Sequence, residues 1–176
     1  MRDKPAHCGK VCLAAHLLPG EFCLLAVGLD ETPNAFVFDE VNSAELEEFK
    51  NILKLYSSEY QSSIWMYQDR ILETELRGCQ LRSVSSCSKP DTLAIVTDSF
   101  LKKKKIQIGS SLSLRRKLAE FKGQNPSSQV LALFCAVEQL QGKLNGTHEP
   151  RKPLVSISQP IQFPLSAYTQ NRYRRY

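Results

Sequence analysis

The chain has 176 residues, of which 42% are hydrophobic, and its formal net charge is +5 at pH 7. This length suffices for one domain with a buried core, and no apolar run approaches the roughly 18 residues that a membrane span requires. The composition therefore excludes a membrane-spanning chain and a chain too polar to fold, and it predicts a globular intracellular protein.

The charge is distributed unevenly. Residues 1–100 contain 9 basic and 15 acidic residues, whereas residues 101–176 contain 14 basic and 3 acidic residues, so the two parts carry −6 and +11. A basic half predicts an acidic partner. Nucleic acid, a phosphoinositide surface and an acidic protein all fit this description.

Three strands are predicted in the first part of the chain, over residues 11–18, 21–29 and 35–41. The turn pair Pro19-Gly20 separates the first two strands. The segment 21–29 is apolar almost throughout, which indicates a strand buried on both faces rather than an edge strand.

The most extended pattern runs from residue 43 to residue 78. Its apolar residues follow one another at steps of three or four, the period of a helix: Leu46, Phe49, Leu53, Tyr56, Tyr60, Ile64, Tyr67 and Ile71. One unbroken helix of about 50 Å is predicted. Two helices in series remain an alternative, because serine pairs at 57–58 and 62–63 favour a break.

The apolar stripe has two interpretations. In the first, it is the buried face of a helix that lies on a sheet. In the second, the excess length of the helix carries a partner-binding surface, to which Trp65 adds an aromatic residue of the kind that anchors interfaces. The candidate partner-binding residues are Tyr56, Tyr60, Ile64, Trp65, Tyr67 and Ile71.

Three further strands and two helices are predicted after residue 78. The strands cover 80–84, 92–97 and 105–109, the last two forming a hairpin around a basic connection. The helices begin near Ser111 or Ser113 and at Pro126, and they end at Gly123 and Asn145. Prolines recur beyond residue 147, so we expect a single domain over 1–146 and a flexible basic tail over 147–176.

These elements predict an α+β fold in which a mixed or antiparallel sheet is packed by one long amphipathic helix and two C-terminal helices. From residue 21 to residue 144, the element order resembles the longin-type folds of membrane-traffic proteins. The resemblance lies in the order of the elements and in no sequence motif. It implies a trafficking adaptor as an alternative function.

Cysteine and histidine are the candidate metal ligands. The chain has six cysteines, several inside apolar runs, which indicates reduced, buried thiols. His7, Cys8, Cys12 and His16 form a set of zinc-type ligands. The run around Cys12 predicts a strand, however, and a strand spreads side chains at steps of four beyond the reach of one ion. We therefore predict neither a metal nor a cofactor.

Catalysis receives little support from the sequence. The chain contains no nucleophile elbow, phosphate loop, dinucleotide glycine pattern or His-Glu-x-x-His motif. A cysteine nucleophile paired with His16 or His148 stays open as a second alternative. The sequence therefore favours a protein that is not an enzyme.

Clustered cations are the clearest functional signal in the chain. They suit contacts with phosphates, and the aromatic residues between the last arginines suit stacking on unpaired bases. The alternative roles of these cations are solubility, protection of an edge strand and nuclear import. The candidate residues are Lys102, Lys103, Lys104, Lys105, Arg115, Arg116, Lys117, Arg172, Arg174 and Arg175.

Together these features predict a non-catalytic protein-interaction subunit of an intracellular multiprotein assembly, located in the nucleus rather than the cytoplasm. Other protein subunits are the expected partners, and the basic C-terminal half is the expected contact for nucleic acid. The oligomeric state and the biological process stay open.

Overall fold

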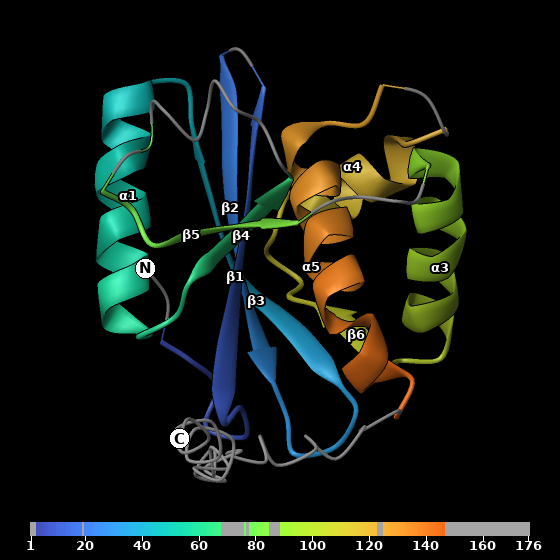
Figure 1. Ribbon diagram of the computed structural model, residues 1–176. Coiled ribbons are helices and arrows are strands. Elements are labelled where there is room, and N and C mark those ends of the chain that lie inside the picture. The colour runs from blue at the N-terminus through green and yellow to red at the C-terminus, as the bar shows by residue number, and fades with distance from the viewer. Residues whose placement is uncertain are drawn as a thin grey trace, which may run out of the picture.

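A mixed sheet of six strands forms the centre of the molecule (Figure 1). The structure, a computed structural model, describes residues 3–18, 20–67, 76, 78–84, 89–122 and 125–146. The strands are β1 (Lys10–Leu18), β2 (Glu21–Leu29), β3 (Ala35–Ser43), β4 (Ile64–Tyr67), β5 (Leu81–Val84) and β6 (Ile106–Ile108).

The strand order across the sheet is β5-β4-β1-β2-β3-β6. The first three strands form an antiparallel meander, because short turns connect them. β4 is parallel to β1, β5 is parallel to β4, and β6 is parallel to β3. The order places β5 and β6 at opposite edges of the sheet.

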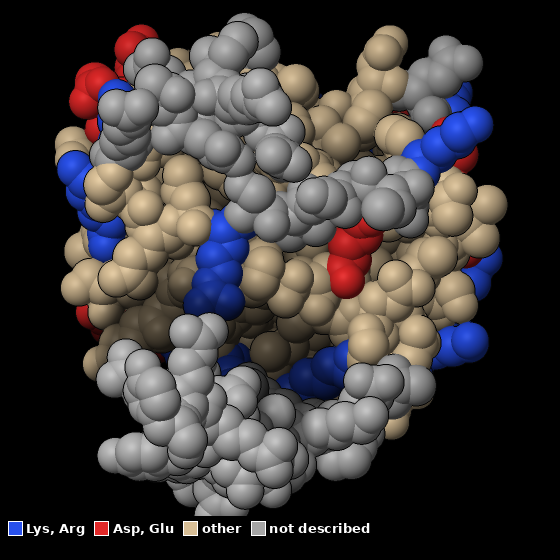
Figure 2. All heavy atoms as spheres, in the orientation of Figure 1, with Lys and Arg blue, Asp and Glu red and all other residues tan. Residues whose placement is uncertain are grey.

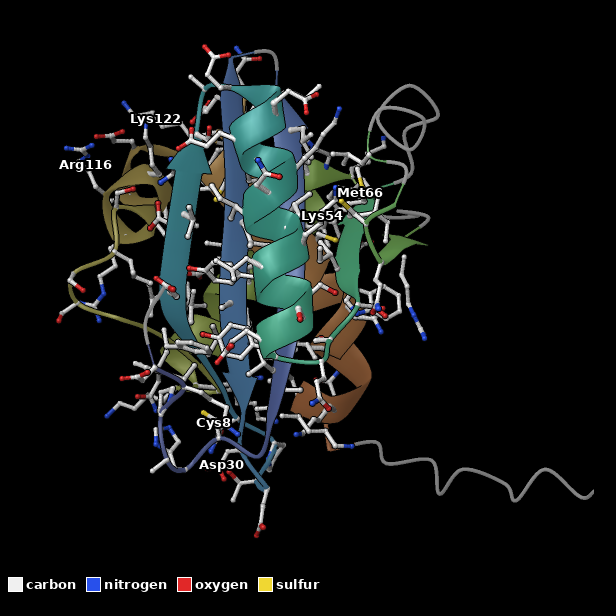
Figure 3. All side chains as sticks on the ribbon, turned by 90° about the vertical axis from the view of Figure 1, so that its left-hand side faces the viewer. Cys8, Asp30, Lys54, Met66, Arg116 and Lys122 are labelled. Carbon is white, nitrogen blue, oxygen red and sulfur yellow. The ribbon has the colours of Figure 1, made fainter. Side chains whose placement is uncertain are left out.

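Helices cover both faces of the sheet. Helix α1 (Leu46–Glu59) lies on one face. On the other side lie α3 (Pro90–Lys102), α4 (Leu114–Glu120) and α5 (Ser128–Leu144) (Figure 1). Figure 3 shows α1 lying along the meander strands. None of the helices in the described residues is long and apolar enough to cross a membrane.

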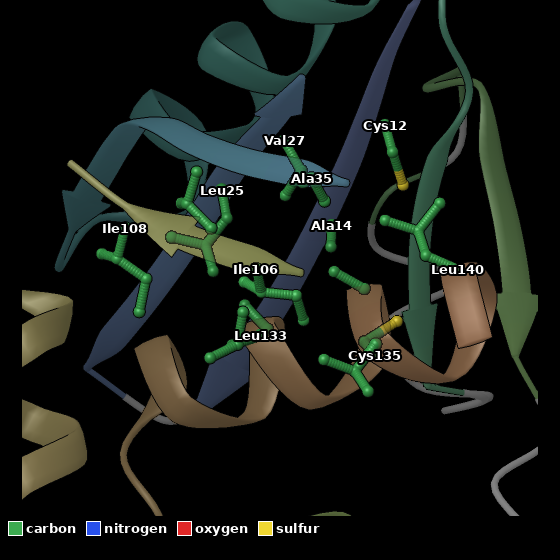
Figure 4. Packing of buried hydrophobic residues seen from close by; sticks show 14 of the residues in the cluster. Cys12, Ala14, Leu25, Val27, Ala35, Ile106, Ile108, Leu133, Cys135 and Leu140 are labelled. Carbon is green, nitrogen blue, oxygen red and sulfur yellow. The ribbon is translucent and has the colours of Figure 1, made fainter. Parts of the chain in front are cut away.

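The two faces of the sheet have separate cores. Because successive side chains of a strand point to opposite faces, Leu13 faces α1 whereas Cys12 and Ala14 face α5. Figure 4 shows the α5 side, where Leu133 packs against side chains of the central strands. Burial on both faces explains why β1 and β2 are apolar almost throughout.

The fold class predicted from the sequence is confirmed as a mixed sheet packed by helices. The bounds of β2 agree with the prediction, and those of the other meander strands agree within two residues. Strand β5, strand β6 and the last two helices also lie in their predicted segments. Residues 147–176, the predicted tail, lie outside the described residues.

The prediction of one long helix over 43–78 is wrong, because residues 64–67 form a strand. Helix α1 ends at Glu59, the backbone turns at Gln61 with a φ of 47°, and the chain enters β4. β4 pairs with β1 on one side and β5 on the other. Hydrogen bonding of β4 to these two strands and burial of its aromatic and branched side chains outweigh the helical spacing of the apolar residues.

The predicted strand over 92–97 is also wrong, because this segment lies in α3. Pro90 occupies the first turn, where its missing N–H costs nothing. Leu93, Thr97 and Phe100 then share the buried side. Consequently Lys102–Lys105 do not form a hairpin tip; they connect the end of α3 to β6.

Candidate nucleic-acid interface

A basic groove lies beside the edge strand β6. Its volume is about 930 Å³, and it runs between the end of α3, β6 and the start of α4. The side chains that line it include Leu101, Lys104, Gln107, Ser110, Arg115 and Leu118. We call these residues and the adjoining Lys103 the basic groove.

The end of α3 positions Lys103 and Lys104. The N–H of Lys105 donates to the carbonyl of Phe100 at 2.9 Å, and the N–H of Lys104 donates to that of Leu101 at 3.0 Å. These bonds form a Schellman motif, with Lys104 in the left-handed conformation at a φ of 56°. The turn ends the helix and leaves Lys103 and Lys104 exposed.

Arg115 is fixed on the other side of the basic groove. Its Nε and Nη2 donate to the carbonyl of Ile108 at 3.0 and 2.6 Å. The start of α4 is anchored to β3, because the Glu40 carboxylate accepts Ser113 Oγ–H at 2.5 Å and the N–H of Leu114 at 3.0 Å. The fold thus brings Lys104 and Arg115 to one groove from separate elements.

The remaining predicted cations are placed differently. Lys102 and Arg116 form ion pairs with Asp98 at 2.6 Å and Glu120 at 3.8 Å. Lys105 donates to the carbonyl of Leu144, which holds β6 to the end of α5. Lys117 is half-buried. The three arginines at 172, 174 and 175 lie outside the described residues.

The predicted partner-binding residues do not form one surface. Tyr56 and Ile64 are buried in the α1-side core, where the Tyr56 hydroxyl donates to Asp39 Oδ2 at 2.6 Å. Tyr60 is half-buried on the same side, whereas Trp65 and Tyr67 pack toward α5. Ile71 lies outside the described residues. The stripe is split because it crosses from a helix into a strand, whose side chains alternate between faces.

Four of the five described cysteines are buried, and Cys79 is half-buried. Burial raises the pKa of Cys12 to about 12, and it also raises the pKa values of Cys8, Cys23, Cys79 and Cys135. A reactive cysteine has a lowered pKa. The raised pKa values therefore do not support the alternative of a cysteine-dependent enzyme among these five; Cys87 lies outside the described residues.

A second polar cluster joins β1, β4 and α5 at the carboxyl ends of the two strands. The rings of His16 and Tyr67 lie 6.2 Å apart, edge to face. Burial, followed by the neighbouring Glu138 carboxylate, raises the pKa of the Tyr67 hydroxyl. The prediction from the sequence missed this cluster, although Glu138, an acidic residue within the apolar stretch of α5, was a signal that could have revealed it.

No family model and no curated protein matches the chain. Solved structures do match. The nuclease domain of the large terminase from Thermus phage P74-26 has a TM-score of 0.62 and 16% identity, over 80% of this chain and 83% of that one. The large terminase nuclease from thermophilic phage G20c with bound magnesium has a TM-score of 0.58 and 17% identity, over 77% and 83%.

The nuclease domain of the bacteriophage SPP1 large terminase with bound Mn also matches, with a TM-score of 0.55 and 13% identity over 76% of this chain and 88% of that one. The fold resembles that of these terminase nuclease domains. At these identities the likeness shows the fold alone.

The likeness to nuclease domains corrects three expectations from the sequence. It contradicts the prediction of a non-catalytic interaction subunit, and it contradicts the prediction that the chain is not an enzyme. It also replaces the longin-type resemblance, which depended on element order alone. Element order was an insufficient criterion because residues 64–67 were predicted in a helix and residues 92–97 in a strand, whereas they lie in β4 and α3.

A magnesium-type ion prefers about six oxygen ligands. On the side of the sheet that faces α5, β1 offers Cys12, Ala14 and His16, and β4 offers Trp65 and Tyr67. Within the described residues, no three His, Cys, Asp or Glu side chains lie together in a way that could hold a metal ion. The described residues by themselves therefore do not fit such a centre, and we derive no metal-dependent step from them.

Proposed function

We propose that this protein binds DNA through the basic groove. The observation that carries the proposal is the convergence of Lys104 and Arg115 on one groove, beside the exposed Lys103, in a fold shared with terminase nuclease domains. The cations suit a phosphate backbone, and the arginine offers planar, charged N–H donors. The net charge of +11 over residues 101–176 attracts the same polyanion from a distance.

Replacing both Lys103 and Lys104 by glutamine will weaken DNA binding by about tenfold at moderate salt, because two phosphate contacts are lost. The slope of log affinity against log salt will fall in magnitude by about 2, close to one per contact removed. Fluorescence anisotropy of a labelled duplex, titrated at several salt concentrations, measures both quantities.

The matched control replaces Lys54 and Lys89 by glutamine. Both side chains are exposed; Lys54 lies on α1, and Lys89 precedes the opposite end of α3. The control changes the net charge by the same amount outside the basic groove. Equal losses of affinity in the two double variants would show a diffuse charge effect and would reject the basic groove as the binding site.

DNA cleavage is a second candidate function, favoured by the fold shared with nuclease domains. Glu138 supplies one carboxylate beside Tyr67.

The cleavage candidate predicts that plasmid DNA is nicked in the presence of Mg²⁺ or Mn²⁺. Glu138→Gln will lower the rate at least about tenfold, since it removes the carboxylate beside Tyr67. The substitution will not weaken DNA binding, and the exposed Glu31→Gln serves as the control. Intact plasmid after incubation with the unmodified protein would reject this candidate and leave the DNA-binding proposal in place.

A DNA ligand agrees with the nuclear location expected from the sequence. That location, and the expected association with other protein subunits, stay predictions. Staining of the tagged protein in cells and its co-purification after nuclease treatment would test them.

A further inference from the structure

A second hollow opens at the opposite edge of the sheet from the basic groove. Its volume is about 810 Å³, within the range of small-ligand sites. The lining residues include Lys4, Lys10, Ser62, Ser63, Trp65 and Arg82. Figure 2 shows the face nearest to β4 and β5, where Lys and Arg side chains surround a recess.

A guanidinium lies over an aromatic ring in this hollow. Trp65 in β4 and Arg82 in β5 are partners in the parallel register, and Arg82 Cζ lies 5.5 Å from the centroid of the Trp65 ring. Trp65 is half-buried against the α5-side core, which fixes its ring. Arg82 is exposed, so its guanidinium remains accessible from solvent.

The rest of the hollow provides cations and a fixed polar wall. Lys4 and Lys10 join Arg82, against the acidic Asp3 and Glu59, so the lining carries one net positive charge. The wall is fixed because Ser62 Oγ donates to the carbonyl of Val11 at 3.0 Å, which joins the segment before β4 to β1. A ligand with both a planar ring and a negative charge would use both features.

We propose that the hollow binds an unpaired base of single-stranded nucleic acid, with the base stacked on the Trp65–Arg82 pair and its phosphate near Lys10 or Lys4. This inference rests on the proposed DNA-binding function and adds that the hollow prefers single-stranded DNA to a duplex. Unpaired bases stack on aromatic rings and on guanidinium planes, whereas a duplex keeps its bases inside. The protein therefore binds single-stranded DNA at a site separate from the basic groove.

Trp65 is the one tryptophan of the chain, so its fluorescence reports directly on the hollow. The experiment titrates the full chain with an oligothymidine of twelve nucleotides, and separately with a duplex, following tryptophan emission and the anisotropy of the labelled DNA. We expect the single strand to quench the emission and the duplex to leave it nearly unchanged.

Two variants separate stacking from charge. Arg82→Ala will weaken binding of the oligothymidine by about five- to tenfold, in keeping with the loss of one stacking contact. Arg82→Lys will weaken binding almost as much, because lysine retains the charge but lacks the planar group. Lys54→Ala, which removes an exposed cation outside the hollow, will bind like the unmodified protein. Thermal melts confirm that each variant is folded.

The outcomes distinguish the two proposals. Binding of both DNAs with unchanged tryptophan emission and full affinity in Arg82→Ala would overturn the inference and leave the basic groove standing. If Arg82→Lys binds the oligothymidine with full affinity and Arg82→Ala does not, the charge of residue 82 explains binding and the stacking contact is rejected. Absence of binding to either DNA would overturn the proposed function, and the inference with it.

Discussion

Replacing Tyr56 by alanine will lower the free energy of unfolding by about 3–5 kcal/mol, the range for removing a large aromatic side chain from a core. Tyr56 is only 3% exposed, its ring packs on Tyr60 with centroids 5.8 Å apart, and its hydroxyl donates to the buried Asp39. The substitution leaves a cavity and also takes a donor from a buried carboxylate. Urea unfolding followed by circular dichroism measures the loss.

The neighbouring Leu55 provides the control, because it is 55% exposed on the same helix. Leu55→Ala will change the free energy of unfolding by less than about 0.5 kcal/mol. The comparison also tests the interpretation of the apolar stripe. A Tyr56→Ala variant as stable as the unmodified protein would show that Tyr56 is a surface residue, as a partner-binding role requires.

Replacing Phe134 by alanine will cost a similar amount, about 3–5 kcal/mol. Phe134 is fully buried on α5, and its ring meets that of Phe121 edge to face at 5.8 Å. The same cluster contains Leu93 of α3 and Val130 of α5. Phe134 therefore joins α3 and the end of α4 to α5, and these helices also carry the two sides of the basic groove.

This variant will also weaken DNA binding beyond the effect of its stability, because α3 and α4 lose part of their common support. Anisotropy at a temperature where the variant remains folded measures this loss. Phe134→Leu, which retains most of the volume, will lose about 1 kcal/mol and keep its affinity. Ile95→Ala, at a side chain 71% exposed on α3, is the surface control. If folded Phe134→Ala binds DNA as tightly as the unmodified protein, the basic groove does not depend on the packing around Phe134.

The sequence by itself determined the meander and the last helix. Alternating and continuous apolar runs defined β1, β2 and β3, because short turns bring strands that are adjacent in the sequence into antiparallel pairing. The charge asymmetry pointed to the cations from Lys102 to Lys117. Local patterns of this kind need no knowledge of distant contacts.

The tertiary structure alone decided which segments with ambiguous periodicity became helix or strand. Ile64 to Tyr67 continue a helical stripe, yet they form β4 because β1 and β5 lie on either side to pair with them. Residues 92–97 are as apolar as a strand, yet they form α3 because the chain must cross over between parallel strands.

The candidate site was decided in the same way. Lys104 and Arg115 are eleven positions apart in the sequence, and they meet at one groove only because α3 ends beside β6 and Glu40 anchors α4 to β3. Trp65 and Arg82 face each other only through the parallel register of β4 and β5. A sequence pattern records which side chains are available, whereas long-range backbone pairing determines which of them come together.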